Sequence, residues 1–324
     1  MKKWFYLQIS GGNRIIAKVE KIPALKYIVE TVLDSVWKNM AKVNLAYGRR
    51  VKKEQEEKNS DFLYKLTAVL IAKNEGDYIK EWLEYHQLVG IDHVVIYDNE
   101  SNDDLKKQID EYIKEGFVDY QYVSGRGMQI ASYNDAVVRY KNVSKYLAFI
   151  DADEFLVPLS SQDIYDTVDE LMCSNPNAGG VVVNWRMFGP SGHVKKPEGL
   201  VIENYLYRTK ENTPQNNCIK TIANPRLIKE VVHAHYSKYI TGIYSIDDSG
   251  RPVFGSQNVN HKPSKLRINH YFTKSKEEWD KRRKLGKADT KDVKDLRTDA
   301  EFYMYDNKDV YDDYMLKFVE KIRQ

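Results

Sequence analysis

The stretch from residue 149 to residue 158 reads Phe149-Ile150-Asp151-Ala152-Asp153-Glu154-Phe155-Leu156-Val157-Pro158, an apolar strand that ends in three carboxylates. Residues two apart in an extended backbone project to the same side, so Asp151 and Asp153 can converge while Ala152 packs inward. Two carboxylates at one point suit Mg²⁺ or Mn²⁺, which also bind phosphate oxygens. The stretch therefore points to a nucleotide diphosphate held through a metal.

Three other interpretations of these acidic residues compete with a metal site. An EF-hand loop that begins at Asp151 would need Gly where Leu156 stands and Glu where Gln162 stands, so it fails. A helix N-cap at Asp153 conflicts with the preceding run, which is typical of a buried strand. A solvated acidic loop stays open when these residues are taken alone.

The region upstream alternates between strands and helices. Residues 66–72 form an apolar run typical of a parallel sheet, a helix is predicted from Asp77 to Gly90, and residues 93–97 form a second strand. Asp103 or Asp104 can cap the next helix, over residues 105–112. This order predicts a mainly parallel sheet with right-handed crossovers, and ligands bind beyond the carboxyl ends of such strands.

Acidic and amide side chains follow all three predicted strands. The pairs are Asn74/Glu75, Asp98/Asn99 and Asp151/Asp153. Ordinary turn chemistry would explain Asp98-Asn99 by itself. Because the three strand ends meet at one edge of a parallel sheet, their coincidence favours a binding site there.

At this point the sequence resembles glycosyltransferases of families 2 and 92, which have the GT-A fold. The motifs that carry the resemblance are Ala72-Lys73-Asn74-Glu75, Glu81-Trp82-Leu83-Glu84-Tyr85-His86, Tyr97-Asp98-Asn99-Glu100-Ser101, Phe149 to Phe155, Trp185-Arg186-Met187-Phe188-Gly189 and Asn269-His270-Tyr271 with Lys274-Ser275 and Lys281. They are in the expected order over roughly residues 64 to 290. The resemblance implies an α/β GT-A fold, Rossmann-like, with a mixed and mainly parallel central sheet flanked by helices and with N- and C-terminal helical appendages.

The resemblance also implies roles for individual residues. The donor, usually a UDP-sugar, would contact Ala72, Asn74, Glu75, Asp98, Asn99, Gln129 and Asp151. The metal, Mn²⁺ or Mg²⁺, would be held by Asp151, Asp153 and His270, with His233, His235 and His261 as the other histidines that could serve. Of the two aspartates, Asp153 is the expected direct ligand, Asp151 is expected nearer the ribose or a metal-bound water, and Glu154 supports them.

The catalytic base cannot be chosen from the sequence. An inverting transfer needs a carboxylate within about 3 Å of the attacking hydroxyl, directly or through one water. Relatives often carry it after the strand that corresponds to residues 181–185, where this chain has no acidic pair. Four acidic residues are available downstream, namely Glu198, Glu203, Asp247 and Asp248. Inversion is the expectation, and a retaining mechanism stays open.

The function expected is metal-dependent hexosyl transfer from a nucleotide-sugar, such as a UDP-sugar, to a glycan or glycolipid acceptor in surface polysaccharide or glycoconjugate synthesis. A nucleotidyltransferase on a related fold is one alternative, although it normally opens with a Gly-rich phosphate loop that residues 72–75 lack. The other alternative is a catalytically degenerate sugar-binding protein, against which the intact Asp151/Asp153 pair argues.

Composition sets limits on the architecture and the compartment. The 324 residues, 42% of them hydrophobic, predict an N-terminal extension over 1–60, a transferase domain over 61–275 and a C-terminal helical segment over 276–324. Two separated cysteines indicate neither a disulfide scaffold nor a zinc site, and a cytoplasmic location is expected. A net charge of +3 without a basic aromatic stripe argues against nucleic acid as a partner.

Two flanking segments lie outside or at the border of the resemblance. Between residues 22 and 40 an apolar helical stripe consists of Leu25, Ile28, Val29, Val32, Leu33, Val36 and Met40, and a basic run follows at 49–53. The stripe is expected to dock on the transferase core or on another subunit of a homo-oligomer. The alternative is peripheral contact with the inner face of an anionic membrane that carries a lipid-linked acceptor. The tail over 298–323 is expected to be a packing helix.

Overall fold

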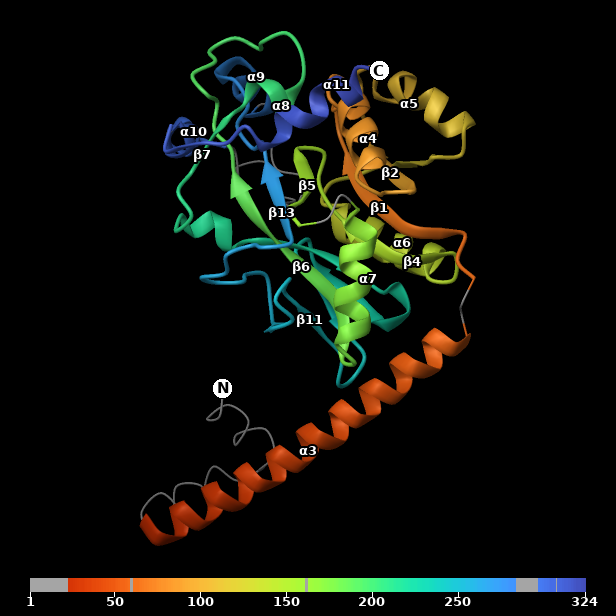
Figure 1. Cartoon of the computed structure of the whole chain (residues 1–324), viewed down its shortest axis with the longest axis vertical. Coiled ribbons are helices and arrows are strands. Elements are labelled where there is room, and N and C mark those ends of the chain that lie inside the picture. The colour runs from red at the N-terminus through yellow and green to blue at the C-terminus, as the bar shows by residue number, and fades with distance from the viewer. Residues whose placement is uncertain (1–22, 59–60, 161–162, 284–296, 307) are drawn as a thin grey trace.

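The computed structural model of the protein describes residues 23–58, 61–160, 163–283, 297–306 and 308–324. Its centre is a ten-stranded mixed sheet with the order β12-β11-β6-β8-β4-β1-β2-β3, to which β13 and β5 are added beside β6 (Figure 1). The strands of this sheet are β1 (Tyr64–Ala72), β2 (His93–Asn99), β3 (Val118–Val123), β4 (Ser144–Phe149), β5 (Glu154–Pro158), β6 (Ala178–Met187), β8 (Ile219–Ala223), β11 (Tyr244–Ile246), β12 (Pro252–Val253) and β13 (Leu266–His270).

Strand direction determines where the site lies. The strands β1, β2, β3 and β4 are parallel, and β8 runs antiparallel to both β4 and β6. Strands β4 and β6 therefore run the same way, and β13 is parallel to β6 and antiparallel to β5. The carboxyl ends of β1, β2, β4, β6 and β13 consequently face one edge of the sheet. The predicted fold class, an α/β fold with a mixed and mainly parallel central sheet, is confirmed.

Helices cover both faces of the sheet. The helices are α3 (Pro23–Lys58), α4 (Ile79–Leu88), α5 (Leu105–Lys114), α6 (Gln129–Tyr140), α7 (Ile164–Ser174), α8 (Val201–Asn204), α9 (Lys276–Arg283), α10 (Asp299–Tyr305) and α11 (Val319–Ile322). On one face, α4, α5 and α7 bury Trp82, Leu105 and Val168 with Leu70 of β1. On the other face, α6 buries Tyr133 and its neighbours against β1, β2 and β4.

The predicted helix boundaries are close to those observed. Helix α4 begins at Ile79, two residues after the predicted start, because the Glu75 carbonyl accepts from the amides of Tyr78 and Ile79. Gly90 follows the helix with a φ of 101°, a conformation that glycine adopts without strain. Of the two predicted caps for α5, Asp103 accepts from the Leu105 amide at 3.1 Å, and Asp104 makes no side-chain cap.

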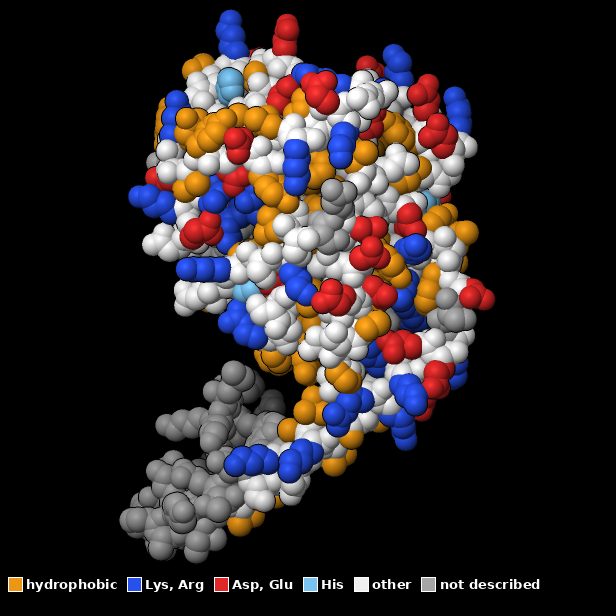
Figure 2. Space-filling view, in the orientation of Figure 1, with side chains coloured by type: hydrophobic (Ala, Val, Ile, Leu, Met, Phe, Trp, Pro, Cys, Tyr) orange, Lys and Arg blue, Asp and Glu red, His pale blue; other side chains and the backbone are white. Residues whose placement is uncertain are grey.

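Helix α3 is longer than the predicted segment and extends away from the body of the protein (Figure 1). Val32, Val36 and Met40 of the predicted stripe are 55%, 47% and 47% exposed, and hydrophobic side chains are visible along the helix (Figure 2). The expectation that the stripe docks on the core is therefore wrong for these three residues. The side chains of Leu25, Ile28, Val29 and Leu33 lie outside the described residues.

A later part of α3 makes the contact with the core instead. Gly48 packs so closely on the Gly242 turn that a Cβ would lie 2.7 Å from the Gly242 backbone. The buried Lys52 ammonium donates to the carbonyls of Met172 and Asn175 at 2.7 and 3.1 Å. The Asn177 side chain donates to the Leu45 carbonyl at 2.8 Å. Contact of the exposed stripe with another subunit or a membrane stays a prediction.

The expectation of a helical tail over 298–323 is only partly correct. Short helices α10 and α11 are present, with a 3₁₀ turn at Tyr314–Phe318, but β14 (Val310–Tyr311) pairs with β7 (Tyr207–Arg208) between them. Asp312 fixes this strand through ion pairs of 2.7 Å with Arg208 and 2.8 Å with Arg267. A second small sheet joins β9 (Ile228–His233) to β10 (Tyr236–Tyr239). Within the described ranges, no helix combines the length and apolar character that crossing a bilayer requires.

Candidate active site

The acidic stretch forms a tight turn between β4 and β5. The Asp151 amide donates to the Glu154 carboxylate at 3.0 Å, and the Glu154 amide donates back to the Asp151 carbonyl at 3.1 Å. The Trp82 indole of α4 donates to the carbonyls of Asp151 and Glu154. The turn thus connects two strands and does not begin a helix. These hydrogen bonds fix the conformation of the turn that carries both aspartates.

Asp153 and His270 come together as predicted. His270 ends β13, which pairs with β5 so that His270 lies opposite Glu154. The His270 Nε2 atom is 3.3 Å from the Asp153 Oδ2 atom, and both side chains are buried. Arg282 of α9 places Nη1 2.6 Å from the same oxygen. Two nitrogens thus lie close to one buried oxygen. That oxygen has no hydrogen bond of good geometry within the described residues.

Asp151 points to a different set of partners. Its Oδ2 atom is 2.8 Å from the Lys220 ammonium of β8, and its Oδ1 atom accepts from Gln129 at 2.9 Å and Tyr133 at 3.2 Å. Asp151, Asp153 and His270 do not place three ligand atoms within 4.8 Å of one another in the described residues. The structure therefore brings together two of the three predicted metal ligands, Asp153 and His270. Gln129 and Asp151, both predicted donor contacts, are hydrogen-bonded to each other.

Burial and charge together determine the protonation of this turn. Burial alone would raise the pKa of Asp153, but Arg282 and His270 hold that pKa well below its ordinary value. Glu154 is fully buried, and desolvation raises its pKa to about 7 although Lys220 opposes the shift. Burial would lower the pKa of Lys220, yet Asp151 and Glu154 raise it. Asp153 consequently stays ionised at neutral pH, as a metal ligand must.

The turns after β1 and β2 are held by each other. Asn74 has a φ of 58°, its amide donates to the Ser101 hydroxyl, and its carbonyl oxygen Oδ1 accepts from the Asn102 amide. Asp98 accepts from the Ser101 amide at 2.9 Å and from the Tyr120 hydroxyl at 2.7 Å. Ala72 pairs with Asp98 in the β1–β2 register. The structure thus places these predicted donor residues side by side at the strand ends.

The remaining predicted donor residues, Asn99 and Glu75, and two residues near them, Arg126 and Asn134, have different surroundings. Asn99 donates to the Gly125 carbonyl at 2.9 Å and so holds the loop before α6. Asn134 exchanges two hydrogen bonds with the Val231 backbone and ties α6 to β9. Arg126 is exposed in its loop. Glu75 lies 3.8 Å from the Lys274 ammonium, which rests 3.3 Å above the Tyr78 ring.

A polar cavity of about 370 Å³ lies between the turns after β1 and β2. Its lining residues are Gly76, Asp77, Asn102, Asp103, Asp104 and Gln108. None of the strand-end carboxylates at Asp98, Asp151 or Asp153 lines it. The ion-pair geometry around Asp153, rather than this cavity, identifies the candidate site, because catalysis requires convergent charged groups.

A second acidic group lies between β11 and β13. Ligand atoms of Asp247, Asp248 and His261 are all within 4.8 Å of one another, which is the spacing of a metal site. Arg251 already pairs with Asp247 Oδ2 at 2.9 Å and donates to His261 Nδ1 at 2.8 Å. Since a guanidinium only donates, the His261 proton is on Nε2, 2.6 Å from Asp248 Oδ1. Hydrogen bonds and ion pairs join these four side chains, the β11 cluster hereafter, to one another.

The four candidate bases have partners away from Asp153. Asp247 and Asp248 belong to the β11 cluster, Glu203 pairs with Arg323 at 2.8 Å, and Glu198 is exposed. Within the described ranges, no hydrogen bond or ion pair joins any of the four to Asp151 or Asp153. The structure does not select one of them.

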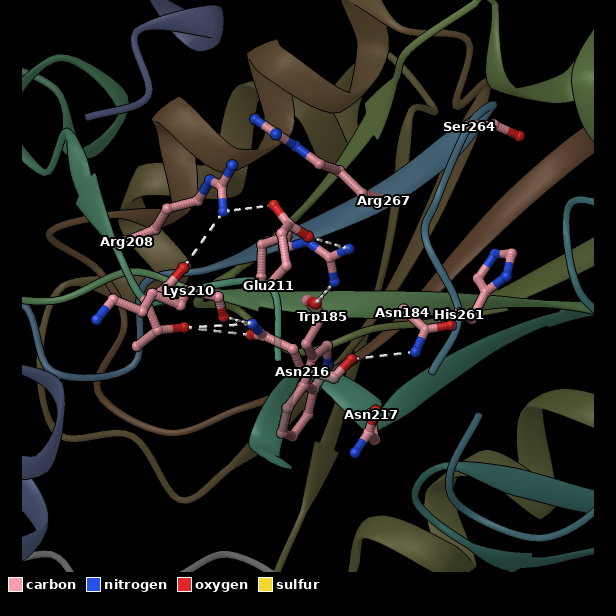
Figure 3. Close-up of polar contacts among 12 residues, drawn as sticks. Asn184, Trp185, Arg208, Lys210, Glu211, Asn216, Asn217, His261, Ser264 and Arg267 are labelled. Carbon is pink, nitrogen blue, oxygen red and sulfur yellow. Dashed lines mark hydrogen bonds and ion pairs between the residues drawn. The ribbon is translucent and has the colours of Figure 1, made fainter. Parts of the chain in front are cut away.

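Successive residues of β6 project to opposite faces and have different surroundings. On one face the Trp185 ring lies 4.4 Å from the His270 ring and 5.1 Å from the His235 ring. The preceding residue, Asn184, donates to the Asn216 carbonyl at 3.0 Å, and Glu211 pairs nearby with Arg208 at 2.8 Å (Figure 3). Phe188, at 1% exposure, is a core residue. Trp185 is the aromatic side chain of this motif that borders the site.

Sequence reasoning missed Lys220 and Arg282. A signal for Lys220 was present, because it interrupts the apolar run Ile219-Lys220-Thr221-Ile222-Ala223, and a lysine buried in a strand needs a carboxylate partner. Arg282 had no such signal, since its helix is strongly charged throughout and Lys281 seemed the matching motif residue. Lys281 instead pairs with Glu277 at 3.1 Å on the helix surface.

Comparison with known proteins agrees with this geometry. The sequence model described as "Glycosyltransferase family 92" matches residues 70–302. The chain belongs to glycosyltransferase family 92. A family 92 protein of Ricinus communis is 29% identical over 61% of this chain and 34% of its own length. The beta-1,4-galactosyltransferase of Caenorhabditis elegans is 25% identical over 75% of this chain and 56% of its own length.

The family 92 chain covers only part of these proteins, about a third of the length of the Ricinus communis relative. Solved structures with partial similarity include TarS of S. aureus in complex with UDP, which is 15% identical with a TM-score of 0.34 over 50% of this chain and 47% of that chain. Another is glucosyl-3-phosphoglycerate synthase of Mycobacterium tuberculosis with Mn²⁺, UDP-glucose and phosphoglyceric acid, 19% identical with a TM-score of 0.25 over 40% of this chain and 45% of that chain.

Proposed function

We propose that this protein is a metal-dependent, inverting glycosyltransferase that moves a hexose from a UDP-sugar to a glycan or lipid-linked acceptor. The observation that carries the proposal is the buried pair Asp153–His270, whose ligand atoms are 3.3 Å apart at the carboxyl ends of the strands. That separation suits two neighbouring ligands of one ion, because Mg²⁺ binds oxygens at about 2.1 Å and adjacent ligands then lie about 3 Å apart.

The residues present fit a divalent metal. Asp153 Oδ2 is a buried oxygen that lacks a well-formed hydrogen bond in the described chain, and its low pKa keeps it anionic. Asp153 and His270 would hold Mn²⁺ or Mg²⁺, an oxygen and nitrogen set that Mn²⁺ accepts readily. A bound ion would neutralise charge that builds on the diphosphate leaving group.

The remaining strand-end residues are proposed to bind the nucleotide. Asp98 uses its carboxylate for Ser101 and Tyr120, but each carboxylate oxygen has two lone pairs and can still accept from a ribose hydroxyl. Asp151 is only partly buried, and Lys220 keeps its carboxylate oriented between β4 and β8. The C. elegans relative, named a beta-1,4-galactosyltransferase, supports hexosyl transfer to a glycan and a β-linked product.

The test measures the melting temperature of the protein in the presence of UDP, ADP or GDP. Each nucleotide is tested with Mn²⁺ and with EDTA. A ligand at a hundred times its dissociation constant adds about 2.7 kcal/mol of stability, so UDP with Mn²⁺ should raise the melting temperature by about 4 °C. Nucleotide-sugars that share the best base are then screened for Mn²⁺-dependent hydrolysis.

Two results would count against the proposal. If UDP raised the melting temperature equally in EDTA, the proposed role of the metal would be wrong, but nucleotide binding would still be supported. The absence of both a nucleoside diphosphate shift and hydrolysis of any nucleotide-sugar would overturn the glycosyltransferase assignment.

A further inference from the structure

Arg282 occupies a position that a metal ligand set does not explain. Its Nη1 atom is 2.6 Å from Asp153 Oδ2 and 2.8 Å from the Phe272 carbonyl oxygen. The same Oδ2 atom is 3.3 Å from His270 Nε2. The guanidinium therefore neutralises the carboxylate oxygen that a divalent ion would need.

The arginine and a divalent ion are electrostatic competitors for this oxygen. A guanidinium stays charged at every accessible pH, so only movement of the side chain can release Asp153. An ion bound to Asp153 at about 2.1 Å would lie close to the guanidinium, and like charges at such short range repel by several kcal/mol at a protein-like dielectric constant. The ion and the guanidinium therefore compete for Asp153 Oδ2, the oxygen that faces His270.

The backbone of α9 is fixed, which limits the movement to the arginine side chain. Glu278 near the start of the helix accepts from the Tyr205 hydroxyl at 2.6 Å, from the Ser275 amide at 3.0 Å and from the Tyr78 hydroxyl. Trp279 of the same helix is fully buried. The Arg282 side chain thus extends from a helix whose backbone is held against the core by Glu278 and Trp279.

We propose that Arg282 is an internal counter-ion of Asp153 that competes with the divalent ion in the nucleotide-free protein and binds the diphosphate when nucleotide and metal enter together. The inference rests on the proposed function. Phosphate oxygens are matched acceptors for the guanidinium fork, so the nucleotide offers Arg282 a partner at the moment that the metal takes Asp153. Metal and nucleoside diphosphate should therefore bind cooperatively, each strengthening the other by the same factor.

The experiment measures Mn²⁺ binding by electron paramagnetic resonance, with and without UDP, in the wild type, Arg282→Gln and Arg283→Gln. Arg283 is the matched control, because it is the next residue of α9 and pairs with Asp299 at 2.7 Å rather than with Asp153. Without UDP, Arg282→Gln should bind Mn²⁺ about tenfold more tightly than the wild type, and the gain in Mn²⁺ affinity caused by UDP should shrink by about the same factor. Arg283→Gln should match the wild type in both.

A conservative variant keeps the inference falsifiable if Arg282→Gln folds poorly. Arg282→Lys retains the charge and should bind Mn²⁺ in the absence of UDP as weakly as the wild type does. Unchanged or weaker Mn²⁺ binding by Arg282→Gln, or a tenfold gain in Arg282→Lys, would overturn the competition. If the wild type fails to bind Mn²⁺ even with UDP, the proposed metal function itself falls, which is a separate and recognisable result.

Discussion

Two groups of aspartate, histidine and arginine in this protein contain similar residues but differ in whether backbone amides hold their carboxylates. In the β11 cluster, Asp247 accepts from the Ser249 and Arg251 amides and pairs with the Arg251 side chain. Asp248 accepts from the Ser264 and Lys265 amides at 2.7 Å each. At the strand ends, the contacts of Asp153 Oδ2 among the described residues come from the side chains of Arg282 and His270.

The difference shows why proximity of ligand atoms is a poor guide to a metal site. The β11 cluster meets a distance criterion that Asp151, Asp153 and His270 together do not meet. Backbone amides hold one oxygen of each β11 carboxylate, so a metal there would have to compete with several hydrogen bonds. Asp153 would give up only its side-chain contacts with Arg282 and His270. We infer that a carboxylate without backbone amide donors marks the site, and that carboxylates held by several amides mark a structural cluster.

The largest expected effect comes from removing one carboxylate charge in each group. Asp153→Asn should lower Mn²⁺-dependent transfer by about a thousandfold, because loss of a metal ligand removes several kcal/mol of leaving-group stabilisation. Asp247→Asn should instead reduce the free energy of unfolding by about 1 to 3 kcal/mol, since its buried partners lose their acceptor. Steady-state kinetics and urea unfolding of both variants give the two numbers.

The comparison would be broken by the reverse outcome. Transfer activity per folded molecule should be within about threefold of the wild type in Asp247→Asn, as a change remote from the transition state predicts. If that variant instead lost Mn²⁺ binding while Asp153→Asn retained it, the metal would belong to the β11 cluster.

A second prediction sharpens the role of Asp151 beside Asp153. Lys220 is 1% exposed and is 2.8 Å from Asp151 and 3.7 Å from Glu154. Lys220→Met should destabilise the fold by about 3 to 5 kcal/mol, because it leaves carboxylates in the interior without their cation. Adding Asp151→Asn should recover part of that loss, since the uncompensated charge is removed as well.

Urea unfolding of the two single variants and the double variant completes the thermodynamic cycle. A coupling energy near zero would mean that Asp151 is not held by Lys220 and is free to serve as a metal ligand, as the sequence alone suggested. A large coupling energy assigns Asp151 to Lys220 and leaves Asp153 as the aspartate that is available for an ion.

Local pattern predicted one half of the strand-end pair, and the resemblance to the glycosyltransferase motifs predicted the other. Period-two geometry brought Asp153 to the strand end. His270 was assigned through the resemblance, and it lies at the same edge because it ends β13. Lys220 and Arg282 could not be assigned, because they are 69 and 131 residues from Asp151 in the sequence, and tertiary packing rather than a local period places them. The same limit explains the tail, where β14 depends on pairing with β7, about a hundred residues upstream.

The smallest expected effect concerns the pH dependence of the β11 cluster. Burial would raise the pKa of Asp248, but hydrogen bonds from His261 and from the Lys265 and Ser264 amides lower it to about 2, below its ordinary value of 3.8. A carboxylate whose pKa is depressed by folding stabilises the native state above its unfolded pKa and loses that contribution as the pH falls through its folded pKa. The contribution here is roughly 2 kcal/mol.

Asp248→Asn isolates this contribution from that of other titrating groups. The variant should be about 2 kcal/mol less stable than the wild type at pH 7, and the difference should shrink between pH 4 and pH 2, where Asp248 takes up its proton. Urea unfolding at a series of pH values measures the difference directly. A difference that stays constant down to pH 2 would mean that the Asp248 charge adds nothing to stability, and the β11 cluster would then lose the physical reason for being closed to a metal.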